Sequence, residues 1–101
     1  MNKVQLSGEF KNLDAHRSEK NGKWYYGFTI TNYDDSKYYH TIPCVMISDD
    51  EENFDGITSI AIEGTVTRRK RVFRDTGKEL YETKILVKKI TDKNFEVKKH
   101  D

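Results

Sequence analysis

The sequence predicts a small all-β domain, and three observations support this prediction. The chain has 101 residues, which is the length of one domain. Residues that favour strands (Val, Ile, Thr, Tyr, Phe and Trp) number 35, against two Ala and four Leu, so a helical bundle fits poorly. Apolar and polar residues alternate with a period of two in five segments, each bounded by turn-forming residues.

The first two segments are expected to form a hairpin. A strand is predicted over about residues 3–13, where apolar side chains recur at alternate positions. Asn21-Gly22 is a strong turn signal, and a second strand is predicted over about residues 23–33. The core-facing side chains of this second strand are Trp24, Tyr26, Phe28 and Ile30.

A third strand and a long hairpin complete the predicted elements. Ile42, Cys44 and Met46 alternate with other residues, and Pro43, which has no N–H to donate, places this strand at a sheet edge or at a bulge. Acidic and turn-forming residues fill 48–56, where we expect a short helix or a turn. Alternation resumes at residue 60 and continues to residue 87 as a hairpin that turns at 75–77.

This element order is that of a five-stranded Greek-key barrel of the OB type, with the short helix or turn between strands three and four. SH3-like barrels and open sheets share the order and stay open as alternatives. We expect an OB-fold domain over residues 1–92 and a short charged C-terminal extension over residues 93–101.

Several other classes of protein are disfavoured. No apolar run approaches the roughly 18 residues of a membrane span, and the N-terminus lacks a signal-peptide pattern, so a cytoplasmic protein is expected. Cys44 alone cannot form an internal disulfide, and the three histidines lack metal-ligand spacing, so no metal or other cofactor is expected. The sequence contains no nucleophile–histidine–acid arrangement and no P-loop, so it predicts no enzyme.

The charge is distributed unevenly along the chain. The formal net charge is only +1. Residues 48–63 hold six acids and no base, whereas residues 64–91 hold nine bases and three acids. The chain therefore carries a segment of charge −6 followed by a segment of charge +6.

Aromatic residues accompany the basic segment. Five bases fall within residues 68–74, which also contain Phe73, and further tyrosines surround the preceding hairpin. Cations that neutralise phosphates, together with rings on which bases stack, are typical of proteins that bind single-stranded nucleic acid. Duplex recognition would need a helix or ribbon that presents base-reading side chains, and no helix of sufficient length is predicted.

The residues resemble the bacterial single-stranded DNA-binding proteins of OB fold. Asn2-Lys3-Val4 with Leu6 and Gly8 is similar to the first strand of that family, Phe28-Thr29-Ile30 is similar to its second strand, and Tyr39-His40 falls at an aromatic-polar pair. The most specific match is the block over residues 62–87, IEGTVTRRKRVFRDTGKELYETKILV.

The resemblance implies roles for individual residues. It implies phosphate contacts from Lys3, Arg69 and Arg71, and base stacking from Tyr39 and Phe73, while Tyr33 falls close to a further stacking position. The sequence ends at 98–101 without the Gly/Gln-rich linker or the acidic, Phe-ended tip of housekeeping members, so we expect a short variant of mobile-element type. Family members recruit replication proteins such as helicase, primase or polymerase and are commonly tetramers, so a homo-oligomer stays open.

We therefore expect a non-enzymatic protein that binds single-stranded DNA with little sequence preference, in replication, recombination or repair. Two alternatives stay open: a protein–protein adaptor of a replication or helicase complex, and an RNA-binding barrel. The candidate nucleic-acid-binding residues are Lys3, Tyr33, Tyr39, Arg68, Arg69, Lys70, Arg71, Phe73 and Arg74.

Overall fold

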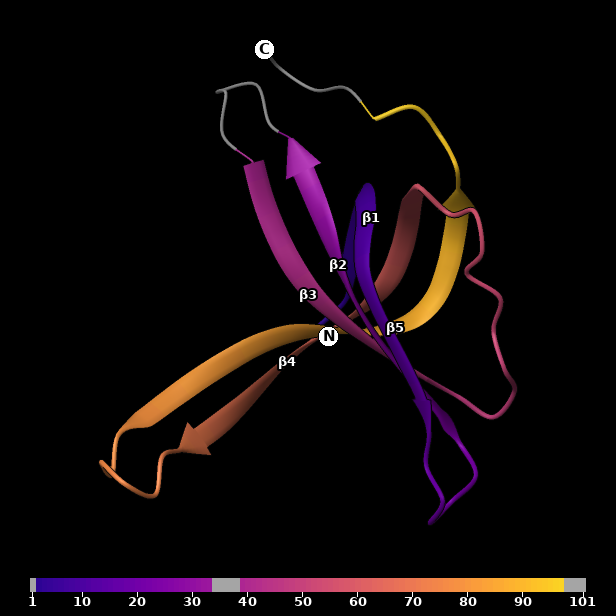
Figure 1. The fold of residues 1–101 in the computed structure, drawn as a ribbon. Coiled ribbons are helices and arrows are strands. Elements are labelled where there is room, and N and C mark those ends of the chain that lie inside the picture. Colours follow the sequence, from indigo (N-terminus) through magenta and orange to yellow (C-terminus); the bar gives the residue numbers. More distant parts are fainter. Residues whose placement is uncertain (1, 34–38, 98–101) are drawn as a thin grey trace.

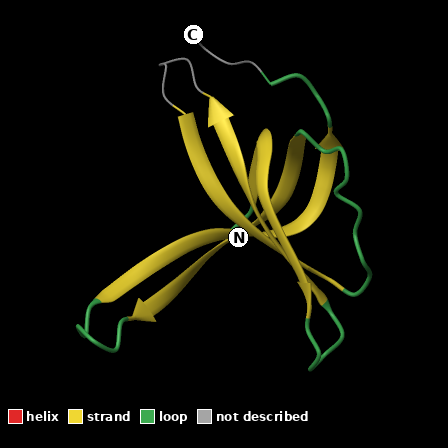
Figure 2. Ribbon diagram, viewed as in Figure 1, coloured by secondary structure: helices red, strands yellow, loops and turns green. Residues whose placement is uncertain are grey.

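The computed structural model describes residues 2–33 and 39–97, and these residues form five β-strands and no helix (Figure 1, Figure 2). The predicted all-β class is therefore confirmed. It follows that the described ranges contain no helix able to cross a membrane. The strands are β1 (Val4–Arg17), β2 (Trp24–Tyr33), β3 (Tyr39–Ser48), β4 (Ser59–Val72) and β5 (Glu79–Lys93).

The five strands close into a barrel in the order β1-β2-β3-β5-β4, with β4 returning to β1. A closed five-stranded sheet is consistent with an OB fold. The closure between β3 and β5 is short, because only Cys44 and Val45 of β3 pair in parallel with Ile85 and Leu86 of β5. The ladder between β2 and β3 passes through Pro43 without a register shift, so β3 tolerates this proline as a strand with little pairing on its second side.

β1 is longer than the predicted strand over residues 3–13. It pairs with β4 up to Glu9 and from Glu9 onward with β2, as far as Arg17. The register shifts between Lys11 and Asp14, where Asn12 adopts a φ of 61°. Pairing between β1 and β2 resumes after this bulge. The bulge depends on the left-handed backbone conformation of Asn12, which a period-two alternation of side chains does not reveal.

The connector between β3 and β4 contains a turn at residues 55–56 and no helix, so the helix alternative is wrong. The physical reason is Phe54, which is 6% exposed and packs into the core against Tyr26, with ring centroids 5.0 Å apart. The Glu52 N–H donates to the Tyr26 hydroxyl at 2.6 Å. The backbone of residues 51–54 has no regular secondary structure, and these contacts replace the hydrogen bonds of a helical turn.

The core lies inside the barrel and is small. Alternation predicted its β2 and β3 members correctly, since Tyr26, Phe28 and Ile30 are buried, as are Cys44 and Met46. Burial raises the pKa of the Cys44 thiol to about 12, so the group is a neutral core residue. The remaining buried hydrophobic residues are Phe54, Ile60, Ile62, Ile85 and Val87.

Candidate nucleic-acid interface

β4 and β5 continue beyond the barrel as a two-stranded ribbon, residues 67–84, which we call the arm (Figure 1). The strands are paired from Thr67–Lys84 to Val72–Glu79. A compact turn closes the tip: the Phe73 N–H donates to the Lys78 carbonyl at 2.9 Å, and the Gly77 N–H donates to the Phe73 carbonyl at 2.8 Å. The arm therefore presents its side chains on two opposite faces.

The outer face of the arm is continuous with the outside of the barrel. Partners directly opposite each other in an antiparallel pair share a face, and alternate residues along each strand do so too. Ile85 is buried inside the barrel, so Leu86 and its partner Val45 face outward. The same phase along the arm gives the outer face Thr67, Arg69, Arg71, Leu80, Glu82 and Lys84.

The outer face carries a surplus of positive charge. Arg71 Nη1 donates to Glu82 Oε1 at 3.1 Å, and its guanidinium lies 5.5 Å from the centre of the Phe73 ring. Arg69 and Lys84 have no ion pair within the described residues. Together with neighbouring arm residues they line a depression of about 470 Å³. A cationic depression beside an exposed ring suits a phosphate and its neighbouring base.

Two of the predicted residues, Arg68 and Lys70, extend from the inner face of the arm. Arg68 lies over the Tyr81 ring at 4.2 Å, and Lys70 forms an ion pair with Glu79 at 2.8 Å. Alternation puts these side chains opposite to those of Arg69 and Arg71. Arg68 is therefore directed away from the depression, whereas Lys70 still contributes to its lining, and Arg74 lies exposed in the turn at the tip.

Lys3 immediately precedes β1, whose first residue, Val4, pairs with Gly64 of β4. Its Nζ is 2.5 Å from Glu63 Oε1, and this hydrogen bond with Lys3 lowers the pKa of the Glu63 carboxyl. Lys3 is therefore paired with an acid on the barrel wall, and it lies close to the root of the arm, because the neighbouring Asn2 amide donates to the Val66 carbonyl at 2.8 Å.

Tyr33 and Tyr39 form a pair across β2 and β3, at the end of these strands that lies away from the arm (Figure 1). The Tyr33 hydroxyl donates to Glu9 Oε2 at 3.3 Å, so an acid accompanies this ring. The Tyr39 side chain lies outside the described part of the chain, so the structure does not test its predicted stacking role.

A row of two rings and one aliphatic side chain lies on the outside of the barrel, and none of its residues is among the predicted nucleic-acid-binding residues. His16, Tyr25 and Ile47 stand directly opposite one another on β1, β2 and β3. The His16 and Tyr25 rings are stacked, with centroids 5.4 Å apart and planes 9° apart, and Ile47 is 45% exposed. Alternation assigns Tyr25 to the outside, but only the strand register shows that His16 lies beside it.

The row leads toward the arm along one surface. Gly27 is two residues beyond Tyr25 on the same face and pairs with Val45, which pairs with Leu86 at the root of the arm. A Cβ at Gly27 would meet nothing within 4 Å, so the backbone here is open to solvent. The outer face of strands two and three, flanked by adjacent loops, is where OB folds bind oligonucleotides.

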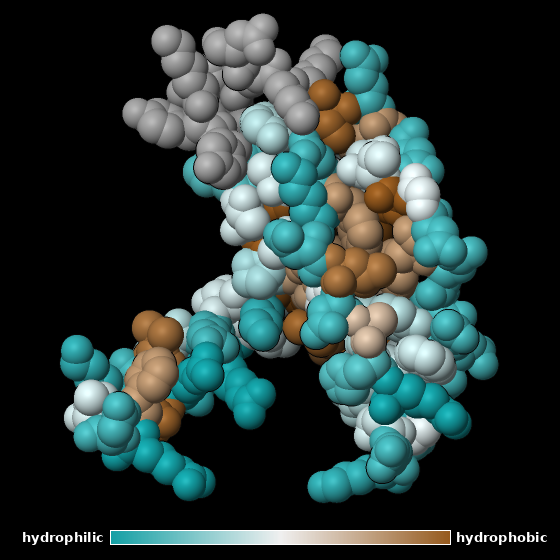
Figure 3. Space-filling model, in the orientation of Figure 1, coloured by the Kyte–Doolittle hydropathy of each residue, from teal (hydrophilic) through white to brown (hydrophobic). Residues whose placement is uncertain are grey.

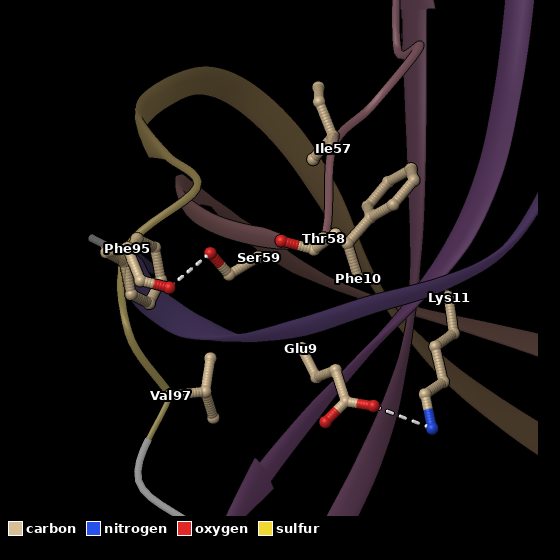
Figure 4. A pocket seen from close by; sticks show the side chains of 8 residues that line it. All are labelled: Glu9, Phe10, Lys11, Ile57, Thr58, Ser59, Phe95 and Val97. Carbon is tan, nitrogen blue, oxygen red and sulfur yellow. Dashed lines mark hydrogen bonds and ion pairs between the residues drawn. The ribbon is translucent and has the colours of Figure 1, made fainter.

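A further pocket of about 490 Å³ lies beside β1, where the chain after β5 crosses the start of β4 (Figure 4). The Ser59 hydroxyl donates to the Phe95 carbonyl at 2.8 Å, and Phe95 and Val97 form one wall. Lys11, the basic residue in the lining, lies 2.7 Å from Glu9, so the pocket lacks the surplus cations of the arm.

Comparison with known proteins gives one structural neighbour to report. No family model matches the chain, and no curated protein matches it significantly. The solved structures that it matches include a small single-stranded DNA binding protein from Mycoplasma pneumoniae, with a TM-score of 0.49 and 20% sequence identity. The match covers 96% of this chain and 98% of that chain.

Proposed function

We propose that the protein binds single-stranded DNA, with little sequence preference, on the outer face of the arm and the adjoining outer face of β2 and β3. The observation that carries this proposal is the continuity of the surface. The His16–Tyr25 stack at one end and the cations of the arm at the other are joined through the Val45–Leu86 pair. A flexible strand can follow such a track, whereas a straight duplex is too stiff to follow its curvature.

Each part of the track has a chemical role in this proposal. Phosphates are neutralised by Arg69, Arg71, Lys84 and, at the tip, Arg74. Bases stack on Phe73, which is 39% exposed, and on the His16–Tyr25 pair. Stacking on a ring is worth about 1–3 kcal/mol per base and depends little on which base it is. Low sequence preference follows from these contacts.

The proposed role is to protect or organise single strands that arise in replication, recombination or repair. The described residues offer no helix for a major groove. The arm is a two-stranded ribbon, which a major groove also admits, so competition between single strands and duplex tests this part of the proposal. No feature of the track is dedicated to a 2′-hydroxyl, so we place DNA before RNA.

Fluorescence anisotropy with labelled oligo-dT of about 20 nucleotides tests the proposal. Four phosphate contacts on a single strand predict that log K falls with log salt at a slope of about −3. Unlabelled single-stranded DNA should compete strongly, and duplex of equal length should compete weakly. Equal competition by duplex, or an affinity that does not change with salt, would contradict the proposal, and stronger competition by matched RNA would reassign the ligand.

A further inference from the structure

The second half of β1 is an exposed sheet edge. β1 pairs with β4 as far as Glu9, and beyond that residue its ladder is with β2 alone, as far as Arg17. On the side away from β2, residues 12–17 have no strand partner within residues 2–33 and 39–97. All of residues 12–17 are exposed. Such an edge presents unpaired backbone N–H and C=O groups, to which a further strand can add.

An apolar groove, which we call the edge groove, lies along this part of β1. Its volume is about 430 Å³, and its apolar lining includes Leu13, Ala15, Trp24 and Tyr26. Leu13 is 43% exposed, and the Trp24 and Tyr26 rings are stacked with centroids 6.3 Å apart. The space-filling view shows apolar atoms gathered on the face between β1 and the connector, with hydrophilic atoms around them (Figure 3). A strand added to the edge therefore finds an apolar floor for its side chains.

The wall of the edge groove opposite β1 is acidic. The connector contributes three carboxylates to the lining: Glu51, Glu52 and Asp55. Glu51 and Asp55 form no ion pair in the part of the chain that the structure describes. The nearby base Arg17 donates to the Gly22 carbonyl at 3.3 Å and does not line the groove. Carboxylates across an apolar floor suit a lysine or an arginine, whose stem is apolar and whose head is a cation.

We propose that the edge of β1 over residues 12–17 and the edge groove together bind an extended basic segment of a partner protein, which adds to the sheet as a further strand. The backbone of this segment pairs with the free edge of β1. Alternate side chains of a strand point to one face, so lysines or arginines at every second position lay their stems on Leu13 and Trp24. Their heads then meet Glu51 and Asp55. Backbone pairing supplies affinity, and the alternate cations supply specificity.

Charge favours a basic partner over a second copy of this chain at the same edge. Residues 48–63, which include the connector, hold six acids and no base. Pairing of the β1 edges of two copies would bring two acidic walls together, and juxtaposed like charges oppose association. A basic segment instead meets charge of the opposite sign.

The proposed contact leaves the DNA track free. Side chains alternate along β2, so Trp24 and Tyr26 line the edge groove while Tyr25 stacks with His16 on the other face. The arm leaves the barrel in a different direction from the hairpin of β1 and β2 (Figure 1). The carboxylates of the groove repel phosphates, so DNA does not compete for it. The inference therefore goes beyond DNA binding, because it gives the protein a separate site that holds a basic partner beside the bound strand.

Titration with a synthetic peptide, in the absence of nucleic acid, tests the inference. The probe is a fluorescein-labelled heptapeptide in which Lys alternates with Thr, and its anisotropy should rise as the wild type binds it. The same peptide with Glu in place of Lys should not bind. Trp24 is the only tryptophan of the chain and lines the groove, so its emission should change as the Lys peptide binds. Raising the salt from about 20 mM to 0.5 M shortens the Debye length from roughly 20 Å to 4 Å and should weaken binding.

N-methylated peptides test the backbone pairing. In an extended strand, the residues of one face direct their N–H groups to one side, and the residues of the other face direct theirs to the opposite side. Methylation of the lysine backbone nitrogens and methylation of the threonine backbone nitrogens therefore block opposite edges of the peptide. One of these two peptides should lose binding while the other keeps it. Equal behaviour of the two would overturn the inference, because the edge of β1 would then not take part.

A charge variant with a matched control tests the acidic wall. E51Q/D55N removes two exposed ion pairs with the Lys peptide and should weaken its binding by roughly 2- to 30-fold. D75N/E96Q removes the same charge at exposed positions, at the tip of the arm and after β5, and should bind like the wild type. Absence of binding by the wild type, unchanged binding by E51Q/D55N, or an equal loss in the control would each overturn the inference.

Sedimentation velocity of the wild type completes the test. Dimers that exclude the peptide from the edge would assign it to a second copy and would also overturn the inference. Peptide binding is measured without DNA, so a failure of the proposed function leaves these results unaffected.

Discussion

Removing two arginines from the outer face should weaken DNA binding and flatten its dependence on salt. In the double variant R69Q/R71Q the depression between β4 and β5 loses two of its cations. Each phosphate neutralised on a single strand contributes about 0.7 to the slope of log K against log salt, so the slope should become shallower by about 1.4. At about 0.1 M salt, two such contacts are worth roughly 25-fold in affinity, or about 2 kcal/mol.

The Arg71–Glu82 pair affects this magnitude only slightly. Both side chains are partly exposed, with 61% of Arg71 and 30% of Glu82 accessible, and an exposed pair is worth about 0–1 kcal/mol. Exchanging the Glu82 carboxylate for a DNA phosphate as the partner of Arg71 therefore costs little free energy. E82Q should raise the affinity for oligo-dT by a few-fold at most.

The assay is anisotropy of labelled oligo-dT across a salt series, with K88Q/K89Q as the control of equal charge change. Residues 88 and 89 are exposed on the barrel wall, away from the depression on the arm. The reasoning is refuted if R69Q/R71Q keeps the slope of the wild type, or if the control variant changes the slope as much as R69Q/R71Q does.

Three further results are expected. Y25A should lower the affinity for oligo-dT by about 5- to 150-fold through the loss of one stacking ring while leaving the salt slope unchanged, and an altered slope with unchanged affinity would argue against stacking. G64A should cost roughly 1–3 kcal/mol in urea unfolding, because its Cβ would lie against the Leu86 carbonyl oxygen, whereas G27A, with open space, should change little. Cys44, whose pKa is raised by burial, should resist alkylation at pH 8 until the protein unfolds, and because its thiol stays protonated in the folded state, stability should fall as pH rises above about 9; rapid labelling of the native protein would contradict this.

The strands and the core could be predicted from the sequence because the signals for them, side-chain alternation and turn residues, are local. Alternation placed Tyr26, Phe28 and Ile30 inside the barrel, and turn residues separated the strands. The connector was the exception, since its acidic residues favour a helix start locally while Phe54 is held in the core by contacts distant in sequence. A tertiary contact overrode a local preference there.

The candidate site was less predictable, because faces and partners depend on register. A run of bases in one strand alternates between two faces, so Arg68 separates from Arg69 and Arg71, while Lys70 stays at the edge of their depression. The sequence of one strand also does not show which acid on a neighbouring strand will pair with a base, as the ion pair between Lys3 and Glu63 illustrates. The His16–Tyr25 stack needs the bulge in β1 to bring its rings together, and no pattern within either strand indicates it.

Mapping amide chemical shifts on addition of oligo-dT tests the central claim most directly, because it locates the bound strand on the barrel. The largest changes are predicted in one continuous band, from Tyr25 across Val45 and Leu86 to Arg69 and Arg71. The connector over residues 49–55 should change little. Changes confined to the connector, or to the pocket beside β1 and Phe95, would contradict the assignment of the outer face.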